Sequence, residues 1–265
     1  MILRFKHFIL SAVLILVSLS FVSAQETSDK KPNGKPPTAD ATKGVTAEQV
    51  VETAILLYGT RDNLKQIRKS VFERGKISIT NAEGQVEQAN YERWILRGDS
   101  LDKERIRFDQ EFPNAKFSLV YKDNKIFGIF NDSVFQPRED AAKAFENQIW
   151  HGLEVLLRYK ENDAAIELAG KEKLMGVEFH LLDVTDKQNR KTRFFISTKT
   201  FRAMMLEYTE DGIKYKRKFY DYNYAQGTLF PYHSILWADG KQIEETIVQT
   251  ITFGQRVQED LFQGS

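Results

Sequence analysis

Residues 204–253 read MMLEYTEDGIKYKRKFYDYNYAQGTLFPYHSILWADGKQIEETIVQTITF. Two Asp-Gly pairs, at 211–212 and 239–240, separate runs that are rich in aromatic and β-branched side chains. Asp-Gly is typical of the tight turns that join adjacent strands of a hairpin. The stretch therefore predicts four antiparallel strands: Met204–Tyr208, Ile213–Tyr222, Leu229–Trp237 and Ile243–Phe253.

The same two-residue alternation continues upstream of this stretch. Apolar and polar side chains alternate between residues 71 and 122, and short turn signals occur at 81–84, 98–99, 113–114 and 123–124. Further apolar runs cover 166–168, 177–184 and 192–196. A period of two is typical of half-buried strands. The pattern predicts about five strands before residue 137 and about six after it.

Two amphipathic helices are predicted, and Leu64 and Ile67 suggest a further helical segment after Gly59. Thr46 can cap a helix with Gln49 as its capping-box partner, and this is the strongest local signal in the chain. A second helix is predicted after Pro137, with one apolar stripe formed by Phe145, Ile149, Leu153 and Leu156. The element order predicts a mainly β (α+β) fold, a large curved antiparallel sheet with helices covering its concave face.

The first 24 residues read as a secretory signal peptide. Arg4 and Lys6 precede an apolar run from residue 8 to 21, and Val22-Ser23-Ala24 offers a cleavage site. The alternative, a membrane anchor, is disfavoured because the run is shorter than the ~20 residues that cross a bilayer. Residues 25–44 are rich in Pro, Lys and Gly and predict a disordered linker. Residues 45–265 then form a single domain, soluble and periplasmic after cleavage.

The composition excludes several kinds of chemistry. The chain has no cysteine, so disulfides, thiol catalysis and a lipoprotein anchor at the cleavage site are all excluded. Of its 38 basic side chains, two fall in residues 1–24, which leaves 36 against 37 acidic ones. Such a balance disfavours nucleic acid as a partner. No motif calls for a cofactor.

No catalytic or metal motif stands out. His151 and Glu154 lie three residues apart on the second predicted helix, but a two-ligand pair is a weak metal signal and surface or capping roles are favoured. Ser100 and Lys103 match an S-x-x-K string without its companion motifs. The sequence therefore predicts that the protein is not an enzyme and holds no metal, although a site assembled from distant segments stays open.

Two surfaces admit more than one interpretation. Lys214, Lys216 and Lys218 share one face of a predicted strand, which favours a solvated outer face, with acidic lipid headgroups or a protein partner as the alternative. The strand 177–184 is apolar on both parities. Burial on both faces explains that pattern, and a lipid-sized lining is the sharper alternative.

Six strings of the C-terminal half carry a resemblance to a known family: KTRFFI at 191–196, MMLEY at 204–208, FYDY at 219–222, GTLFP at 227–231, ETI at 245–247 and ITF at 251–253. On these strings the chain resembles the LolA-like family of periplasmic carriers that sort outer-membrane lipoproteins. The resemblance covers residues 45–262. It implies an incomplete β-barrel whose hydrophobic concavity is lidded by helices and holds lipoprotein acyl chains or related ligands. The family's lid-locking arginine aligns to no single residue here, so no individual role is carried over.

These observations predict a periplasmic carrier that binds a lipid or a lipoprotein acyl chain between sheet and helices, with a role in outer-membrane biogenesis. The alternative is an envelope-stress sensing or protein-interaction module of the same fold, with a membrane-bound protein as a possible partner. The residues predicted to face the concavity and bind the ligand are Trp94, Ile106, Phe108, Phe117, Leu119, Phe179, Leu181, Phe194, Ile196, Met204, Leu206, Ile247 and Ile251.

Overall fold

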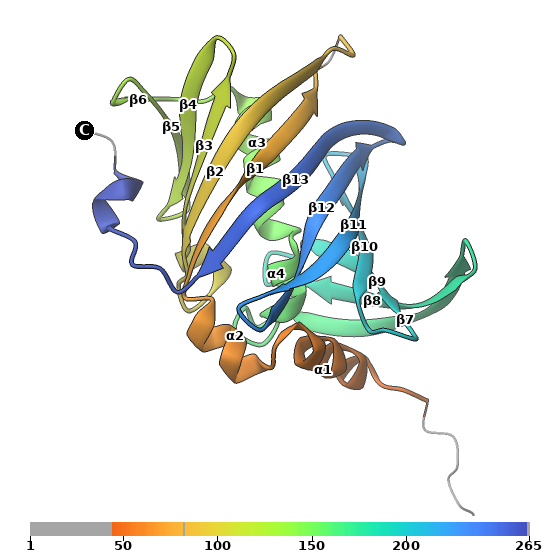
Figure 1. Ribbon diagram of the computed structural model, residues 1–265. Coiled ribbons are helices and arrows are strands. Elements are labelled where there is room, and N and C mark those ends of the chain that lie inside the picture. Colours follow the sequence, from red (N-terminus) through yellow and green to blue (C-terminus); the bar gives the residue numbers. More distant parts are fainter. Residues whose placement is uncertain (1–43, 82, 264–265) are drawn as a thin grey trace, which may run out of the picture. The chain divides into compact units, whose positions relative to one another are not determined.

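The computed structural model describes residues 44–81 and 83–263, and its dominant feature is one 13-stranded sheet (Figure 1). The predicted signal peptide, and all of the predicted linker except Gly44, lie outside the described residues. Among the helices within that part of the chain, none combines the length and the apolar character needed to span a membrane. The helices are α1 Ala47–Tyr58, α2 Arg61–Ile67, α3 Glu139–Trp150 and α4 Leu153–Leu157, with short 3₁₀ turns η1 Leu101–Lys103 and η2 Glu259–Phe262.

The strands follow the sheet in the order β6-β5-β4-β3-β2-β1-β13-β12-β11-β10-β9-β8-β7, and every neighbouring pair is antiparallel. The predicted antiparallel, mainly β fold is confirmed. Pairing of β1 with β13 joins the two halves of the chain, and β6 and β7 are the two open edges. The bounds are β1 Ser70–Thr80, β2 Val86–Leu96, β3 Arg105–Phe112, β4 Ala115–Lys122, β5 Lys125–Phe130, β6 Ser133–Phe135, β7 Ala165–Leu174, β8 Val177–Thr185, β9 Lys191–Ser197, β10 Ala203–Glu210, β11 Ile213–Ala225, β12 Thr228–Ala238 and β13 Lys241–Phe253.

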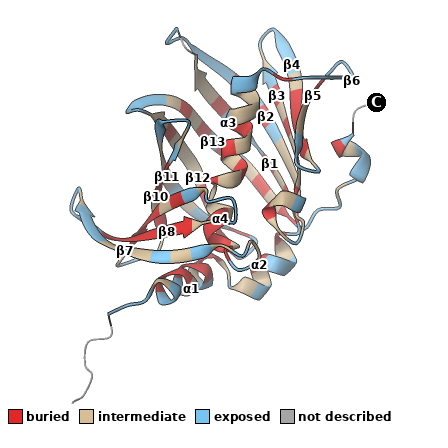
Figure 2. Ribbon diagram, turned by 180° about the vertical axis from the view of Figure 1, so that it is seen from behind, coloured by how far each residue is buried: buried red, intermediate tan, exposed pale blue. Residues whose placement is uncertain are grey.

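Helices cover the concave face of the sheet, as predicted, and α3 runs across it (Figure 2). Phe145 and Ile149 of α3 pack against apolar side chains of β1 to β4. The apolar faces of α1 and α4 pack instead against β8 to β12. The sheet stays open between β6 and β7. The arrangement is an incomplete barrel with its helices inside the curve.

Helix α1 begins where its capping box predicts. The Thr46 side chain accepts a hydrogen bond from the Gln49 amide at 3.2 Å, and the Gln49 side chain accepts one from the Thr46 amide at 2.9 Å. At the other end of the helix, Tyr58 is fully buried. Its hydroxyl donates to the Tyr222 hydroxyl of β11 at 3.0 Å, and the Tyr222 hydroxyl donates to the Ala203 carbonyl. A tyrosine pair thus fastens α1 to the sheet.

The protein is expected to lose stability between about pH 10 and pH 12. Burial raises the pKa of Tyr58 to about 12, whereas an unfolded tyrosine ionises near pH 10. The unfolded chain therefore loses its proton first, and the stabilisation that is present below pH 10 disappears as the pH rises toward 12. Two pKa units correspond to about 3 kcal/mol. Urea unfolding at pH 9 and pH 11.5 measures the difference, and equal stability at both pH values would contradict this assignment.

The second predicted helix is divided in two. A single apolar stripe from residue 145 to 156 predicts one continuous helix, but α3 ends at Trp150 and α4 begins at Leu153. At Gly152 a Cβ atom would lie 2.7 Å from the carbonyl oxygen of Gln148, so the bend needs glycine. The break lets α3 cover one half of the sheet while α4 turns toward the other.

Candidate functional site

An apolar pocket of about 410 Å³ lies between the inner face of β4, the strands β5 and β6 at one edge of the sheet, and the first turns of α3. Nearly all of its wall is hydrocarbon. We call it the apolar pocket; it is lined by Phe117, Leu119, Phe130, Ser133, Phe135, Pro137, Arg138 and Ala141. Its volume falls in the range of about 300–1,000 Å³ that is usual for small-molecule sites.

One glycine shapes the outer wall of this pocket. The Phe135 ring of β6 lies directly over Gly128 of β5, where a Cβ atom would come within 2.2 Å of the ring. Phe130 and Phe135 remain 47% and 37% exposed although both are large apolar side chains. Exposed apolar side chains gathered around a hollow are typical of a ligand-binding or interaction site.

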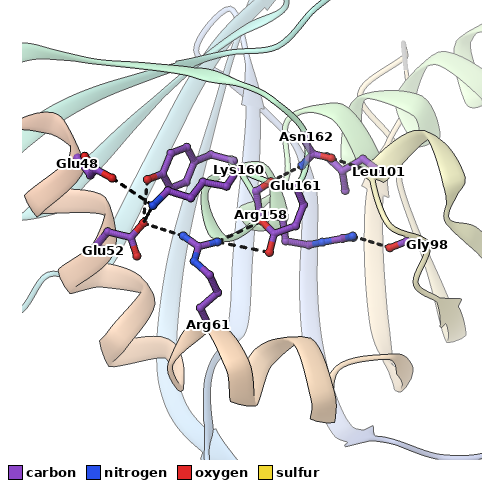
Figure 3. Close-up of polar contacts among 10 residues, drawn as sticks. Glu48, Glu52, Arg61, Gly98, Leu101, Arg158, Lys160, Glu161 and Asn162 are labelled. Atoms are coloured by element: carbon purple, nitrogen blue, oxygen red, sulfur yellow. Dashed lines mark hydrogen bonds and ion pairs between the residues drawn. The ribbon is translucent and has the colours of Figure 1, made fainter.

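We call the helices on the concave face the helical cover. Polar contacts hold this cover in place at α1, α2 and the segment after α4, which are not the residues that line the apolar pocket. The segment after α4 is tied to α1 and α2 through Lys160 and Glu161: Lys160 pairs with Glu52 at 2.9 Å, and Arg61 pairs with Glu161 at 3.2 Å (Figure 3). On its other side, Asn162 accepts a hydrogen bond from the Leu101 amide at 2.8 Å. The first turn of α3 has exposed residues instead. The apolar pocket therefore lies beside the less constrained end of the cover.

We call the β1–β13 pairing the seam of the sheet. A second hollow, of about 170 Å³, lies between α3, α4 and this seam, and charged side chains line much of it. We call it the charged cavity. Four arginines and four glutamates contribute to its wall, and they belong to α4, to β1, β2, β11 and β13, and to the segments beside α2 and η1. They are Arg68, Glu73, Arg93, Arg97, Glu104, Glu154, Arg217 and Glu244.

Ion pairs connect most of these groups. Oε1 of Glu154 accepts from Arg68 at 2.6 Å and from Arg97 at 3.0 Å. Glu104 pairs with Arg97 at 2.7 Å and also with Arg158. Because these groups are largely buried, each pair has to offset a large desolvation cost.

Burial and the arginines act in opposite directions on the glutamates. Burial alone would raise the pKa of Glu154, but Arg68 and Arg97 hold that pKa below its usual value. Burial likewise opposes ionisation of Glu244, and Arg217, 2.8 Å away, lowers the pKa of this carboxyl below normal. Both side chains are therefore carboxylates at neutral pH. The cavity therefore holds ionised groups among apolar side chains.

The predicted ligand-binding residues divide into several groups in the structure. Phe117 and Leu119 line the apolar pocket. Ile106 lines the charged cavity, and Phe108 stacks on Phe145 of α3 with ring centroids 6.1 Å apart. These four lie on the concave face of the N-terminal half.

Other predicted residues lie in the packed core, where no room is left for a ligand. Phe194, Ile196 and Leu206 are completely buried in the core that α1 and α4 form with the C-terminal strands. Ile251 packs with Val71 and Phe253 near the seam. The concave face is therefore solidly packed in its C-terminal half, and its openings lie in the N-terminal half and at the seam.

Five of the predicted residues lie on the opposite face of the sheet, which corrects the placement expected from the sequence. Trp94 packs with Phe262 of the C-terminal segment. A separate outer cluster holds Phe179, Leu181 and Met204. Ile247 is 47% exposed. Its neighbour Thr246 lines the charged cavity, and adjacent strand residues point to opposite faces, so Ile247 lies on the outer face. Both faces of these strands carry apolar residues, so the parity that points inward cannot be chosen from hydrophobicity alone.

Sequence reasoning missed most of the residues around the two hollows. The pocket residues Phe130, Phe135 and Ala141 carry no signal in the sequence that separates them from ordinary apolar positions. The charged cavity does have a signal, because Glu73 and Arg217 occupy the strand parity otherwise held by apolar residues such as Ile77 and Phe219. A charge on the apolar parity of a strand indicates a buried polar group.

The weak motifs do not converge on a reaction centre. The ring nitrogens of His151 contact Thr192 at 2.7 Å and Glu210 at 3.1 Å, whereas Glu154 pairs with arginines. Within residues 44–81 and 83–263, no group of three or more potential metal ligands lies close enough together to hold an ion. On the outer face of β11, Lys214 and Lys216 pair with Glu207, so part of the basic strand is neutralised.

Solved structures share this architecture. A DUF1329 family protein from Desulfovibrio piger matches with a TM-score of 0.60 over 82% of this chain and 97% of its own. A LolA superfamily protein from Nitrosomonas europaea matches with a TM-score of 0.57 over 83% and 98% of the two chains. A putative outer membrane lipoprotein-sorting protein domain from Vibrio parahaemolyticus has a TM-score of 0.52 over 82% and 95%.

Sequence identity is 12% in each of these three comparisons. No protein-family model and no curated protein matches the sequence. At such low identity a structural likeness establishes the fold and leaves the function to the site itself. None of the three proteins is described as an enzyme. The predicted resemblance is confirmed at the level of architecture: this chain has a LolA-like fold.

Proposed function

We propose that this protein is a periplasmic carrier that binds the acyl chain of a lipid or lipoprotein in the apolar pocket. The observation that carries the proposal is an open hollow of about 410 Å³ with an almost wholly apolar wall. A fold shared with a lipoprotein-sorting protein domain supports it. The signal peptide predicted for residues 1–24 supports export.

Hydrocarbon burial is sufficient to drive such binding. Each methylene that leaves water for an apolar wall contributes about 0.8 kcal/mol. The ordering and immobilisation of ligand and protein oppose that gain, so only a chain of several methylenes binds measurably. The open edge at β6 suits this ligand, because an acyl chain can enter along the hollow while its headgroup stays in water.

Filling the pocket with a side chain is expected to weaken acyl binding strongly. Ala141 lines the pocket from α3, and an Ala141→Phe substitution places a ring in the volume that the ligand would occupy. Titration with a fluorescent fatty acid is expected to show at least a tenfold weaker Kd in this variant. The matched control is Ala144→Phe, one turn further along the same helix, where the side chain is exposed.

The control variant is expected to bind the probe like the unmodified protein. Thermal unfolding of both variants checks that the helix remains in place. If Ala141→Phe and Ala144→Phe bind the fatty acid equally well, the apolar pocket is not the acyl site and the proposal fails.

A further inference from the structure

The buried charges in and around the charged cavity have a property that acyl binding does not explain: once Arg158, which pairs with Glu104 beside the cavity, is counted, they do not balance. Arg68, Arg97 and Arg158 are joined in one network with only two carboxylates, Glu104 and Glu154. All three arginine side chains are at most 14% exposed. An ionised group that is buried without a counter-charge strongly destabilises a fold. The network therefore holds one positive charge in excess.

The rest of the cavity does not supply the missing negative charge. Arg217 pairs with Glu244 at 2.8 Å, and Arg93 lies 3.8 Å from Glu73, so these two pairs are balanced between themselves. Burial lowers the pKa of His151, which keeps its imidazole neutral near pH 7. In total, five arginines face four glutamates in and around the cavity.

The excess charge is concentrated on two adjacent guanidinium groups. Arg68 and Arg97 both bind the same oxygen, Oε1 of Glu154, so their positive charges lie side by side. Arg68 is 5% exposed and lines the cavity, yet its Nε and Nη1 atoms have no hydrogen-bond partner in the described chain, and neither does Nε of Arg97. These unpartnered donors mark where a further acceptor is needed.

We propose that the charged cavity binds an oxyanion, a phosphate or a carboxylate, between Arg68 and Arg97. Several oxygens on one small centre match several N–H donors, and arginine is the side chain best suited to such groups. Solvent reaches the network, since the Glu154 side chain keeps 19% of its surface exposed. The anion is either free or the headgroup of a lipid. The site stands independently of the acyl pocket, because its residues and its chemistry are different.

Inorganic phosphate is the first probe, titrated into the full-length protein by calorimetry at constant ionic strength. The unmodified protein is expected to bind one phosphate, and Arg68→Met is expected to weaken the Kd at least tenfold. Because Arg68→Met removes a buried ion pair and can impair folding, Glu154→Gln provides a second test. It removes the competing carboxylate and raises the excess charge, so phosphate is expected to bind at least fivefold more tightly. Arg74→Gln, on the exposed part of β1, is the control and leaves the Kd unchanged.

A lysophosphatidic acid distinguishes the two sources of the oxyanion. If the group is a lipid headgroup, this probe binds at least tenfold more tightly than inorganic phosphate, and Arg68→Met weakens its binding at least tenfold. If the group is a free anion, Arg68→Met weakens the binding of inorganic phosphate and leaves the binding of lysophosphatidic acid unchanged. The proposal is overturned if neither probe binds the unmodified protein, if Arg68→Met and Arg74→Gln behave alike, or if Glu154→Gln fails to strengthen binding.

Discussion

Replacing Glu104 by alanine is expected to lower the free energy of unfolding by about 3–5 kcal/mol. Glu104 is 2% exposed and holds two arginines at once, Arg97 at 2.7 Å and Arg158. Arg158 also donates to the carbonyl of Gly98 at 2.6 Å, so this one carboxylate connects β2, the η1 segment and the chain after α4. Without it, two buried guanidinium groups lose their main counter-charge in a site that already has too few carboxylates.

The control for Glu104→Ala is a substitution in an ion pair on the surface. Glu178 pairs with Lys171 at 3.3 Å across the β7–β8 hairpin, and both side chains are at least half exposed. Exposed pairs contribute about 0–1 kcal/mol, so Glu178→Ala is expected to change the urea midpoint only slightly. If Glu104→Ala is no more destabilising than Glu178→Ala, the network does not hold the helical cover to the sheet.

Substitution of Gly75 by alanine is expected to destabilise the fold by about 3 kcal/mol or more, the upper end of the range for overpacking. Gly75 lies where β1 meets β13, and a Cβ atom there would stand 2.1 Å from the carbonyl oxygen of Ile247. The obstructing atom is backbone, which cannot rotate away. The β1–β13 pairing joins the first six strands to the last seven, so the strain falls on the contact that holds the sheet together.

Ser78→Ala, three residues along the same strand, separates this steric effect from any general sensitivity of β1. Ser78 pairs with Glu245 in the same β1–β13 ladder, and a small side chain is already accommodated there. Its replacement is expected to change stability by less than about 0.5 kcal/mol. Chemical unfolding followed by circular dichroism measures both variants, and a Gly75→Ala protein as stable as Ser78→Ala would contradict the close approach.

The architecture could be predicted from the sequence because its signals are local. Turn pairs such as Asp211-Gly212 and the capping box at Thr46 and Gln49 each depend on a few neighbouring residues, and the structure confirms them. The hydrophobic pattern does not predict the α3–α4 break, because the apolar stripe continues past Gly152 without interruption. Glycine is needed at this position because the backbone of Gln148 lies too close for a side chain.

The site was harder to predict than the fold. Which face of a strand points inward depends on partners far away in sequence, and the C-terminal segment around Phe262 buries Trp94 on the outer face. The apolar pocket lies where Phe135 packs on Gly128 and where the first turn of α3 meets the edge of the sheet, and a hydrophobic pattern predicts neither contact. Charged residues at apolar positions, such as Glu73, were the signal that could have revealed the charged cavity.

Native mass spectrometry of the protein purified from its own cells tests acyl-chain binding most directly. The account predicts one co-purified acyl lipid per chain, lost in the Ala141→Phe variant and kept in Ala144→Phe. A protein that carries no lipid under these conditions, or an Ala141→Phe variant that retains it in full, would contradict the account.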